Sequence, residues 1–289
     1  MPDTSDNQAS QPLEFLEDMR LDAKEPHAGP GNMGRVLFFV AAFAVLALGI
    51  ILVIRAVFSY RSARASYDTI RNHAVSTTDD PPALRRHGDY ASLPEGAVLE
   101  IDFDKISVAQ GTLIGWLHVP ALDISYPVVQ GEDNDYYLDH TTDGTANANG
   151  AIFMECENRP DFSDGNTFLY GHNSVDGSMF GRLHELSISD SYTDTEPYFY
   201  IYRPNGTVDK YRIYSYYYAE TGSRSFVYFR DDASYDYYAG LTMGLSDRAL
   251  DADFSQRGRI VTLATCYGGT GTEYRYLVHG ILEDSGRAD

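Results

Sequence analysis

The feature that most constrains this chain is an uncharged apolar run near its N-terminus, VLFFVAAFAVLALGIILVI, from Val36 to Ile54. A helix of these 19 residues, rising 1.5 Å per residue, nearly spans the roughly 30 Å hydrocarbon core of a bilayer. A cleaved signal peptide is the alternative, but its apolar region usually has about 7–15 residues followed by a small-residue cleavage site. No clear site of that kind follows here, so we expect a retained transmembrane anchor over residues 35–58.

The charges that flank this run do not orient it. Arg20, Lys24 and Arg35 precede it, and Arg55, Arg61, Arg64 and Arg71 follow it. Loops rich in Lys and Arg favour the cytoplasmic side of a membrane, but both flanks carry such residues. The charge count therefore gives no topology, and the orientation must come from the chemistry of the folded domain.

The rest of the chain divides into three parts. Residues 1–34 hold two bases and seven acids without apolar periodicity, which indicates a short disordered tail. Residues 59–95 contain no Gly or Pro before Pro81 and are expected to form a helical linker. Residues 96–289 are expected to form one folded domain, because the aromatic content, with 23 Tyr in the whole chain, suffices for a sizeable core.

Charge and cysteine content exclude several classes of protein. The formal net charge is −20, and affinity for nucleic acid depends largely on Lys and Arg that neutralise phosphates, so nucleic-acid binding is not expected. The chain has two cysteines, too few for a disulfide scaffold and without the spacing of a zinc site. Its acidic clusters also lack the spacing of a calcium loop. We therefore expect no metal and no cofactor.

The folded domain shows the pattern of a β protein. Short apolar or alternating runs rich in β-branched and aromatic residues are separated by turn residues, which predicts strands. These runs are VLEID, LIGWLHV, ISYPVV, AIFME, NTFLYG, YFYIYR, KYRIYSYYYAE, IVTLAT and YLVHGIL. Asn205-Gly206 between two of them predicts a hairpin. Two segments look helical, MFGRLHELS after Ser178 and residues 232–249. Together these features predict a mostly antiparallel β-barrel with helices inserted in its connections.

Three residues at the ends of predicted strands have the chemistry of acyl transfer. Cys266 ends the run RIVTLATC and precedes the glycine-rich loop YGGTGTE, while His172 follows NTFLYG and Arg275 opens the strand after the loop. If the last two strands are adjacent and antiparallel, Cys266 and Arg275 share one rim of the barrel. A thiolate can act as nucleophile, an imidazole can move protons, and a guanidinium can stabilise an oxyanion or orient the scissile carbonyl.

Several ordered blocks of the sequence resemble one family. TLATC with the following RYLVHG is similar to the TLxTC…R motif of sortases, and FLYGHNSVDGSMFGRL is similar to their histidine segment. The version here, together with GTLIGWLHVPALDISYPVVQGEDNDYYLDHTTDG and GAIFMECENRPDFSDGNTFLYGHN, most resembles class B sortases. The resemblance extends from about Ile101 to Leu282, nearly the whole expected domain.

The resemblance implies a fold, a site and an activity. It implies an eight-stranded barrel with N-terminal helices and an inserted helix, with Cys266 as nucleophile, His172 as general acid/base and Arg275 as the oxyanion or substrate-positioning residue. Sortases are membrane-anchored transpeptidases on the outer face of Gram-positive cells. They cleave a sorting signal after its Thr and pass the thioacyl-bound protein to an amine of the cell-wall precursor; class B members take signals resembling NPQTN. This implies a cytoplasmic N-terminus and an extracellular catalytic domain.

Other residues near the site carry separate expectations. We expect Thr265, Tyr267, Asn173 and Glu273, close in sequence to the three residues above, to bind substrate. Cys156 departs from the family pattern and has three readings: a buried structural thiol, a disulfide partner of Cys266, or an accessory redox group. We favour the first, because a disulfide would consume the nucleophile and free Cys is most often buried.

Three functional alternatives stay open beside a wall-attaching transpeptidase. A cysteine protease or hydrolase would use the same thiol and imidazole but release its acyl group to water. A pilin-polymerising sortase would use a Lys side chain as acceptor. A non-catalytic surface adhesin would use the aromatic residues as a binding face and would not need Cys266.

Overall fold

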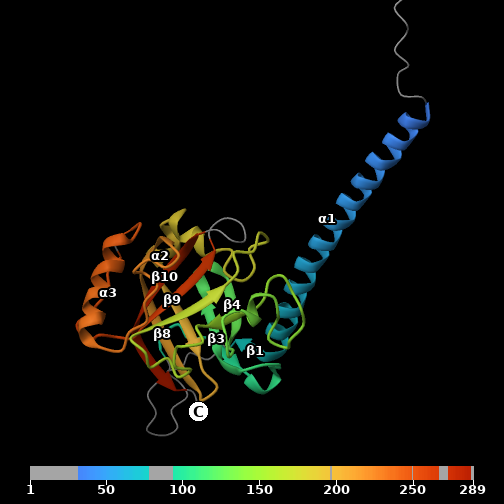
Figure 1. The fold of residues 1–289 in the computed structure, drawn as a ribbon. Coiled ribbons are helices and arrows are strands. Elements are labelled where there is room, and N and C mark those ends of the chain that lie inside the picture. Colours follow the sequence, from blue (N-terminus) through green and yellow to red (C-terminus); the bar gives the residue numbers. More distant parts are fainter. Residues whose placement is uncertain (1–31, 78–93, 196, 249, 267–272, 288–289) are drawn as a thin grey trace, which may run out of the picture. The chain divides into compact units, whose positions relative to one another are not determined.

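The computed structural model describes residues 32–77, 94–195, 197–248, 250–266 and 273–287, and Figure 1 shows their path. The chain divides into two compact units, Met1–Ile54 and Arg55–Asp289, and each is described by itself. Helix α1 (Asn32–Ala74) begins in the first unit and ends in the second. Residues 1–31 of the expected tail lie outside the described part.

The first unit contains the apolar portion of α1. Within the described residues, Asn32–Arg55 is the one stretch of helix long and apolar enough to cross a membrane, and none of its most apolar window is buried inside the protein. This confirms an apolar helix where the sequence predicted one. Length and composition are what establish it, and an N-terminal signal sequence would share both properties.

The second unit is a closed barrel of eight strands, which confirms the expected fold. Its strands are β3 (Thr112–Val119), β4 (Ile124–Gln130), β5 (Ile152–Met154), β6 (Asn166–Gly171), β7 (Tyr198–Tyr202), β8 (Thr207–Glu220), β9 (Ile260–Cys266) and β10 (Tyr274–Arg287). They follow one another around the barrel in the order β10-β8-β7-β3-β4-β5-β6-β9. The pairs β4–β5 and β6–β9 are parallel and the other pairs are antiparallel.

Both faces of the strands that lead to the site are buried and mostly apolar. In β9, Val261 and Leu263 point into the interior cluster, where they meet Tyr276 and Val278 of β10. The alternating residues Ala264 and Leu277 join a second buried cluster with Phe168 of β6 on the other face. Burial on both faces explains why the run IVTLAT lacks the polar alternation of a half-exposed strand.

The hairpin predicted at Asn205-Gly206 is confirmed. It joins β7 to β8, with the Arg203 amide donating to the Thr207 carbonyl at 2.8 Å. Gly206 has φ +83°, in the left-handed region that glycine adopts without a side-chain penalty. The turn therefore has the backbone geometry that an Asn-Gly pair favours.

One of the two expected barrel helices forms as predicted. Helix α3 (Asp232–Leu245) is capped by the preceding residue Asp231, whose carboxylate accepts from the Ser234 amide. Its buried residues Tyr235, Tyr238, Ala239 and Thr242 recur at helical spacing and pack α3 against the outside of the barrel. The segment MFGRLHELS differs from the expectation: its helical part is the 3₁₀-helix η6 (Leu183–Ser187). The Gly181 backbone lies against the Ser174 and Ser178 carbonyls, and this tight turn occupies the first part of the segment.

Short elements complete the second unit. They are β1 (Val75–Thr77), β2 (Leu99–Ile101), η3 (Phe103–Lys105), η4 (Pro120–Leu122), η5 (Tyr136–Leu138) and α2 (Ser191–Thr195). The expected helical linker over 59–95 is helical as far as Ala74, after which β1 pairs with β2. Residues 78–93 of that linker lie outside the described part. The last turns of α1 pack on the barrel through Tyr67, which is 5% exposed.

Candidate active site

Strand register brings three chemically distinct residues to one edge of the barrel. Gly171, the last residue of β6, pairs with Thr265 of the parallel strand β9, so His172 and Cys266 each follow this pair. Cys266 pairs in turn with Arg275 of the antiparallel strand β10. Neighbouring strands lie about 4.8 Å apart, so the three backbone positions form one short row across the sheet. The expected shared rim for Cys266 and Arg275 is confirmed.

The imidazole of His172 is held by a backbone carbonyl. Its Nε2 lies 2.6 Å from the Leu138 oxygen, at the end of η5, and the ring is partly exposed. A carbonyl oxygen can only accept, so Nε2 carries a hydrogen and donates it. In the neutral ring Nδ1 is therefore the nitrogen that can take up a proton. The contact leaves the imidazole with one defined acid/base atom.

Arg275 places a positive charge beside the outer face of β6. Its Nη1 donates to the Tyr274 carbonyl at 3.1 Å, and the side chain is partly exposed. Its charge also acts on Tyr170, whose hydroxyl donates to Glu155 Oε2 at 3.0 Å. Burial and the Glu155 carboxylate raise the pKa of Tyr170, and the Arg275 guanidinium opposes them. The guanidinium is thus close enough to the end of β6 to influence charge there.

The second cysteine differs from the favoured expectation of a buried structural thiol. Cys156 is free and partly exposed, and its Sγ donates to Glu155 Oε1 at 3.3 Å. Partial burial and the neighbouring Glu155 carboxylate raise the pKa of this thiol. A raised pKa keeps sulfur protonated and weakly nucleophilic at neutral pH.

A Cys156–Cys266 disulfide does not fit the register. Glu155 stands at the level of Phe168, because its amide donates to that carbonyl, whereas Cys266 stands at the level of His172 on the far side of β6. Phe168 and His172 are four residues apart, so Glu155 and Cys266 are offset by about 13 Å along the strands. They also lie two strand spacings apart across the sheet, about 10 Å. Disulfides need Cα atoms about 4.4–6.8 Å apart. The two cysteines are therefore too distant to bond in this fold.

The four residues expected to bind substrate have different surroundings. Thr265 is 3% exposed and its hydroxyl has no hydrogen-bond partner among the described residues, which favours a supporting position over direct contact. Asn173 is partly buried and forms an isolated bridge with Met179. Glu273 is exposed, and its carbonyl accepts from the Thr221 amide at 2.6 Å. Tyr267 lies outside the described residues.

Two neighbours of the site were not expected from the sequence. Leu138 contributes a main-chain oxygen, and a pattern of side chains cannot predict which main-chain oxygen lies at the site. Tyr170 lies on β6 two residues before His172, which directly follows that strand, and could have been suggested by this spacing, since alternate residues of an extended chain share a face. Within the described residues, no group of three or more His, Cys, Asp or Glu is arranged to hold a metal ion.

Comparisons of this chain with family models, curated proteins and solved structures all point to the same family. A family model described as "Sortase domain" matches residues 117–283. "Sortase B" of Listeria monocytogenes is 28% identical over 221 residues, which cover 74% of this chain and 87% of that relative. The structure of a mutant form of Clostridium perfringens sortase B has 29% identity and a TM-score of 0.53, covering 59% of this chain and 81% of that one.

A further solved structure contains a substrate. A Staphylococcus aureus sortase B–substrate complex is 26% identical to this chain with a TM-score of 0.54, covering 59% of this chain and 79% of that one. The matched family domain includes His172, Cys266 and Arg275, and it spans more than half of the chain. With the closed barrel and the row of residues at its edge, these similarities establish that the chain belongs to the sortase family, as a cysteine transpeptidase of class B.

Proposed function

We propose that this enzyme cleaves a sorting signal after its Thr through a thioacyl intermediate on Cys266 and transfers the acyl group to a cell-wall amine. The observation that carries the proposal is the register that aligns His172, Cys266 and Arg275 across β6, β9 and β10. The substrate would be a surface protein with a C-terminal signal resembling NPQTN. Tyr267, Asn173 and Glu273 are proposed to contribute to its binding directly, and Thr265 from a buried supporting position.

In the acylation step the Cys266 thiolate attacks the carbonyl carbon of the Thr residue. A C–S bond forms while the Arg275 guanidinium stabilises the negative oxygen of the tetrahedral intermediate. His172 then gives a proton to the departing amine, and the C–N bond breaks. Nδ1 is the atom proposed to carry this proton, because Nε2 is bonded to the Leu138 carbonyl.

Deacylation reverses these roles with a new amine. His172 accepts a proton from the incoming amine nitrogen, which attacks the thioester carbon, and the thiolate of Cys266 leaves. The products are a new amide bond and the free enzyme. Water in place of the amine would give a carboxylic acid instead, the outcome of a hydrolase.

We also propose that the apolar part of α1 anchors the enzyme in the cell membrane with its N-terminus in the cytoplasm and the barrel outside. The composition of Asn32–Arg55 supports the anchor. The substrate class supports the orientation, since a sorting signal and a wall amine meet on the outer surface.

The proposal is tested by product analysis with a peptide that contains NPQTN, incubated with and without a glycine peptide as amine. We expect cleavage after Thr and a new amide product only when the amine is present. Cys266→Ala should abolish both, and His172→Gln should reduce turnover by about 100-fold or more. His184→Gln is a matched control away from the row of three residues and should keep full activity. Acid product at the same rate with and without amine would instead identify a hydrolase.

A further inference from the structure

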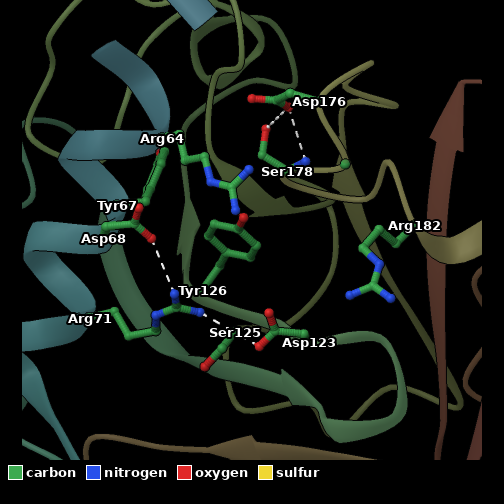
Figure 2. Close-up of a pocket in the computed structure, with 11 residues that line it drawn as sticks. Arg64, Tyr67, Asp68, Arg71, Asp123, Ser125, Tyr126, Asp176, Ser178 and Arg182 are labelled. Atoms are coloured by element: carbon green, nitrogen blue, oxygen red, sulfur yellow. Dashed lines mark hydrogen bonds and ion pairs between the residues drawn. The ribbon is translucent and has the colours of Figure 1, made fainter. Parts of the chain in front are cut away.

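The last turns of α1 contact the segment that faces His172. Tyr67 is buried, and its hydroxyl donates to the Gly150 carbonyl at 2.7 Å. Figure 2 shows the polar pocket beside this contact, lined by α1, by the β3–β4 turn and by the loop that follows β6. Burial raises the pKa of Tyr67, so its hydroxyl stays protonated and able to donate. A residue of α1 is therefore bonded to the chain segment between η5 and β5.

Gly150, which is bonded to Tyr67, also packs against the Leu138 carbonyl that accepts a hydrogen bond from His172. Its φ is +55°, and a Cβ on it would lie 2.2 Å from the Tyr137 oxygen and 2.7 Å from the Leu138 oxygen. The next residue, Ala151, donates its amide to the Tyr137 oxygen at 3.0 Å. Gly150 is thus packed directly on the end of η5. The Leu138 oxygen, set in place by this packing, accepts from His172 Nε2.

A second set of contacts reaches the main chain of His172. The ring of Tyr126 stands edge-on to Tyr67, with centroids 5.4 Å apart, and its hydroxyl accepts from the Met179 amide at 3.1 Å. Phe180, the next residue, donates its amide to the His172 carbonyl at 2.9 Å. The loop that begins with His172 is therefore tied to Tyr126 close to its far end.

Asn149 joins the two sets of contacts. Its Nδ2 donates to Ser178 Oγ at 3.0 Å, and its Oδ1 accepts from Ser174 Oγ at 3.2 Å. Asn149 is next to Gly150 in the chain, and all three polar side chains are buried. The segment bonded to Tyr67 and the loop carrying His172 thus form one connected hydrogen-bonded unit.

From these contacts we propose that Tyr67 is a positioning residue for His172, which it orients through Gly150 and the Leu138 carbonyl. The last turns of α1 then belong to the catalytic apparatus as well as to the connection with the membrane anchor. The proposal rests on the proposed role of His172 as general acid/base. It predicts that the hydroxyl of Tyr67, which is remote from the substrate chemistry, sets which nitrogen of His172 carries the proton.

The test is Tyr67→Phe in the full-length enzyme, which keeps the ring and removes only the hydroxyl. Without the hydroxyl the Leu138 carbonyl loses its support, so we expect kcat to fall by about ten-fold or more while KM stays within about two-fold. In ¹⁵N-histidine spectra the His172 signals should shift away from the pattern of an Nε2–H ring. The His172 signals are identified by their loss in His172→Gln.

Tyr235→Phe is the matched control. Tyr235 is 4% exposed against 5% for Tyr67, and its hydroxyl donates to a glycine carbonyl, that of Gly258, at 2.8 Å on the α3 side of the barrel. We expect it to lower thermal stability about as much as Tyr67→Phe, without changing kcat or the His172 spectrum. Should Tyr67→Phe fail to fold, Tyr126→Phe removes the acceptor of the second set of contacts and is expected to give the same spectral shift.

An unchanged kcat together with an unchanged His172 spectrum in folded Tyr67→Phe would overturn the proposal. If Tyr67→Phe does not fold, an unchanged His172 spectrum in Tyr126→Phe would overturn it. A fall in kcat in Tyr235→Phe equal to that in Tyr67→Phe would also overturn it. Failure of the proposed role of His172 can be distinguished from failure of this proposal, because His172→Gln would then keep full peptide cleavage. The spectrum of His172 reports its orientation in either case, since the signal does not depend on turnover.

Discussion

Gly171 illustrates how a missing side chain fixes the position of His172. A Cβ at this residue would lie 2.4 Å from Ile152 Cδ1 and 2.8 Å from Phe180 Cδ2, both in the barrel core. The end of β6 can therefore approach these side chains only as glycine. His172, the next residue, begins its loop from a backbone position that this close packing defines.

Gly171→Ala should consequently be destabilising and should impair catalysis. Overpacking a core typically costs about 1–3 kcal/mol, and the displaced backbone would shift His172. Urea unfolding measures the free energy, and peptide cleavage measures activity. Gly240→Ala is a suitable control, because a Cβ there meets nothing within 4 Å on α3. Equal stability and equal activity for Gly171→Ala and wild type would contradict the packing argument.

The thiol of Cys156 should react more slowly in the folded protein than in the unfolded chain. The raised pKa of Cys156 means that less thiolate is present in the folded protein than in the unfolded chain at the same pH. In Cys266→Ala, where Cys156 is the remaining thiol, iodoacetamide should react more slowly with folded than with urea-unfolded protein at pH 8. The folded rate should increase as pH rises beyond the ordinary thiol pKa of about 8.5. Equal rates in the two states would contradict this assignment.

At the residue scale the sequence predicted the reactive side chains but not the main-chain groups that hold them in place. His172 and Cys266 come at the ends of strand-like runs, Arg275 opens the last one, and all three match a family motif, so their convergence could be predicted. The Leu138 carbonyl could not, because every residue supplies one. The predicted burial of Cys156 was wrong, because it used the general tendency of free cysteine to be buried, whereas burial at this residue depends on the path of the segment after β5.

At the scale of elements, Asp164 ties the segment after β5 to the start of α3. Its carboxylate is 0% exposed and accepts from Arg230 Nε at 2.6 Å, from the Arg159 amide at 2.8 Å and from Asn158 Nδ2 at 2.9 Å. Burial acts to raise the pKa of Asp164, but the hydrogen bonds led by Arg230 outweigh it and lower the pKa below 3.8. The folded state therefore favours the ionised carboxylate.

This lowered pKa predicts how stability depends on pH. The contribution of Asp164 is fully present above its ordinary pKa of 3.8 and is lost as pH falls through the lower value of the folded state. Asp164→Asn should cost about 1–3 kcal/mol at pH 7, since buried donors lose a charged acceptor. The difference from wild type should shrink in acid. Urea unfolding at a series of pH values measures it, and a difference that grows in acid would contradict the assignment.

Elements with clear periodicity were predictable and irregular ones were not. Helix α3 buries Tyr235, Tyr238 and Thr242 at helical spacing, and it was expected within a few residues of its bounds. The segment before η6 has a similar apolar pattern, but Gly181 is packed against carbonyls of its own loop, and the chain there turns to cover the interior. A tertiary contact of this kind is invisible to a local pattern.

At the scale of the whole molecule, the barrel could be predicted but not the strand register that closes it. Alternating runs and the Asn205-Gly206 turn pointed to an antiparallel barrel, and the family resemblance supplied the number of strands. The parallel pair β6–β9 joins strands that are distant in the chain, and β4–β5 joins consecutive strands through a long connection. Their register depends on burial of both faces, which no short window of sequence reports. The site at the end of β6 and β9 is therefore a product of long-range pairing.

The proposed anchor predicts a separation of membrane binding from catalysis. A variant that lacks residues 1–54 should move from the membrane to the soluble fraction yet keep peptide cleavage, because it retains Tyr67 and the whole second unit. A variant that lacks residues 1–74 should lose most of its cleavage activity, since it removes both the hydroxyl that supports Gly150 and the Tyr67 ring that packs in the core. Fractionation and peptide assays measure both properties. Membrane retention of the first variant, or full activity of the second, would contradict this division.

The most direct test of the proposed mechanism is to locate the acyl group on the enzyme. A sorting-signal peptide is added without amine, the reaction is quenched in acid, and peptide mapping by mass spectrometry identifies the modified residue. We predict the acyl mass on Cys266 in wild type and in Cys156→Ala, and no adduct in Cys266→Ala. An adduct on Cys156, or one that persists without Cys266, would contradict the proposed role of the residues at the end of β6, β9 and β10.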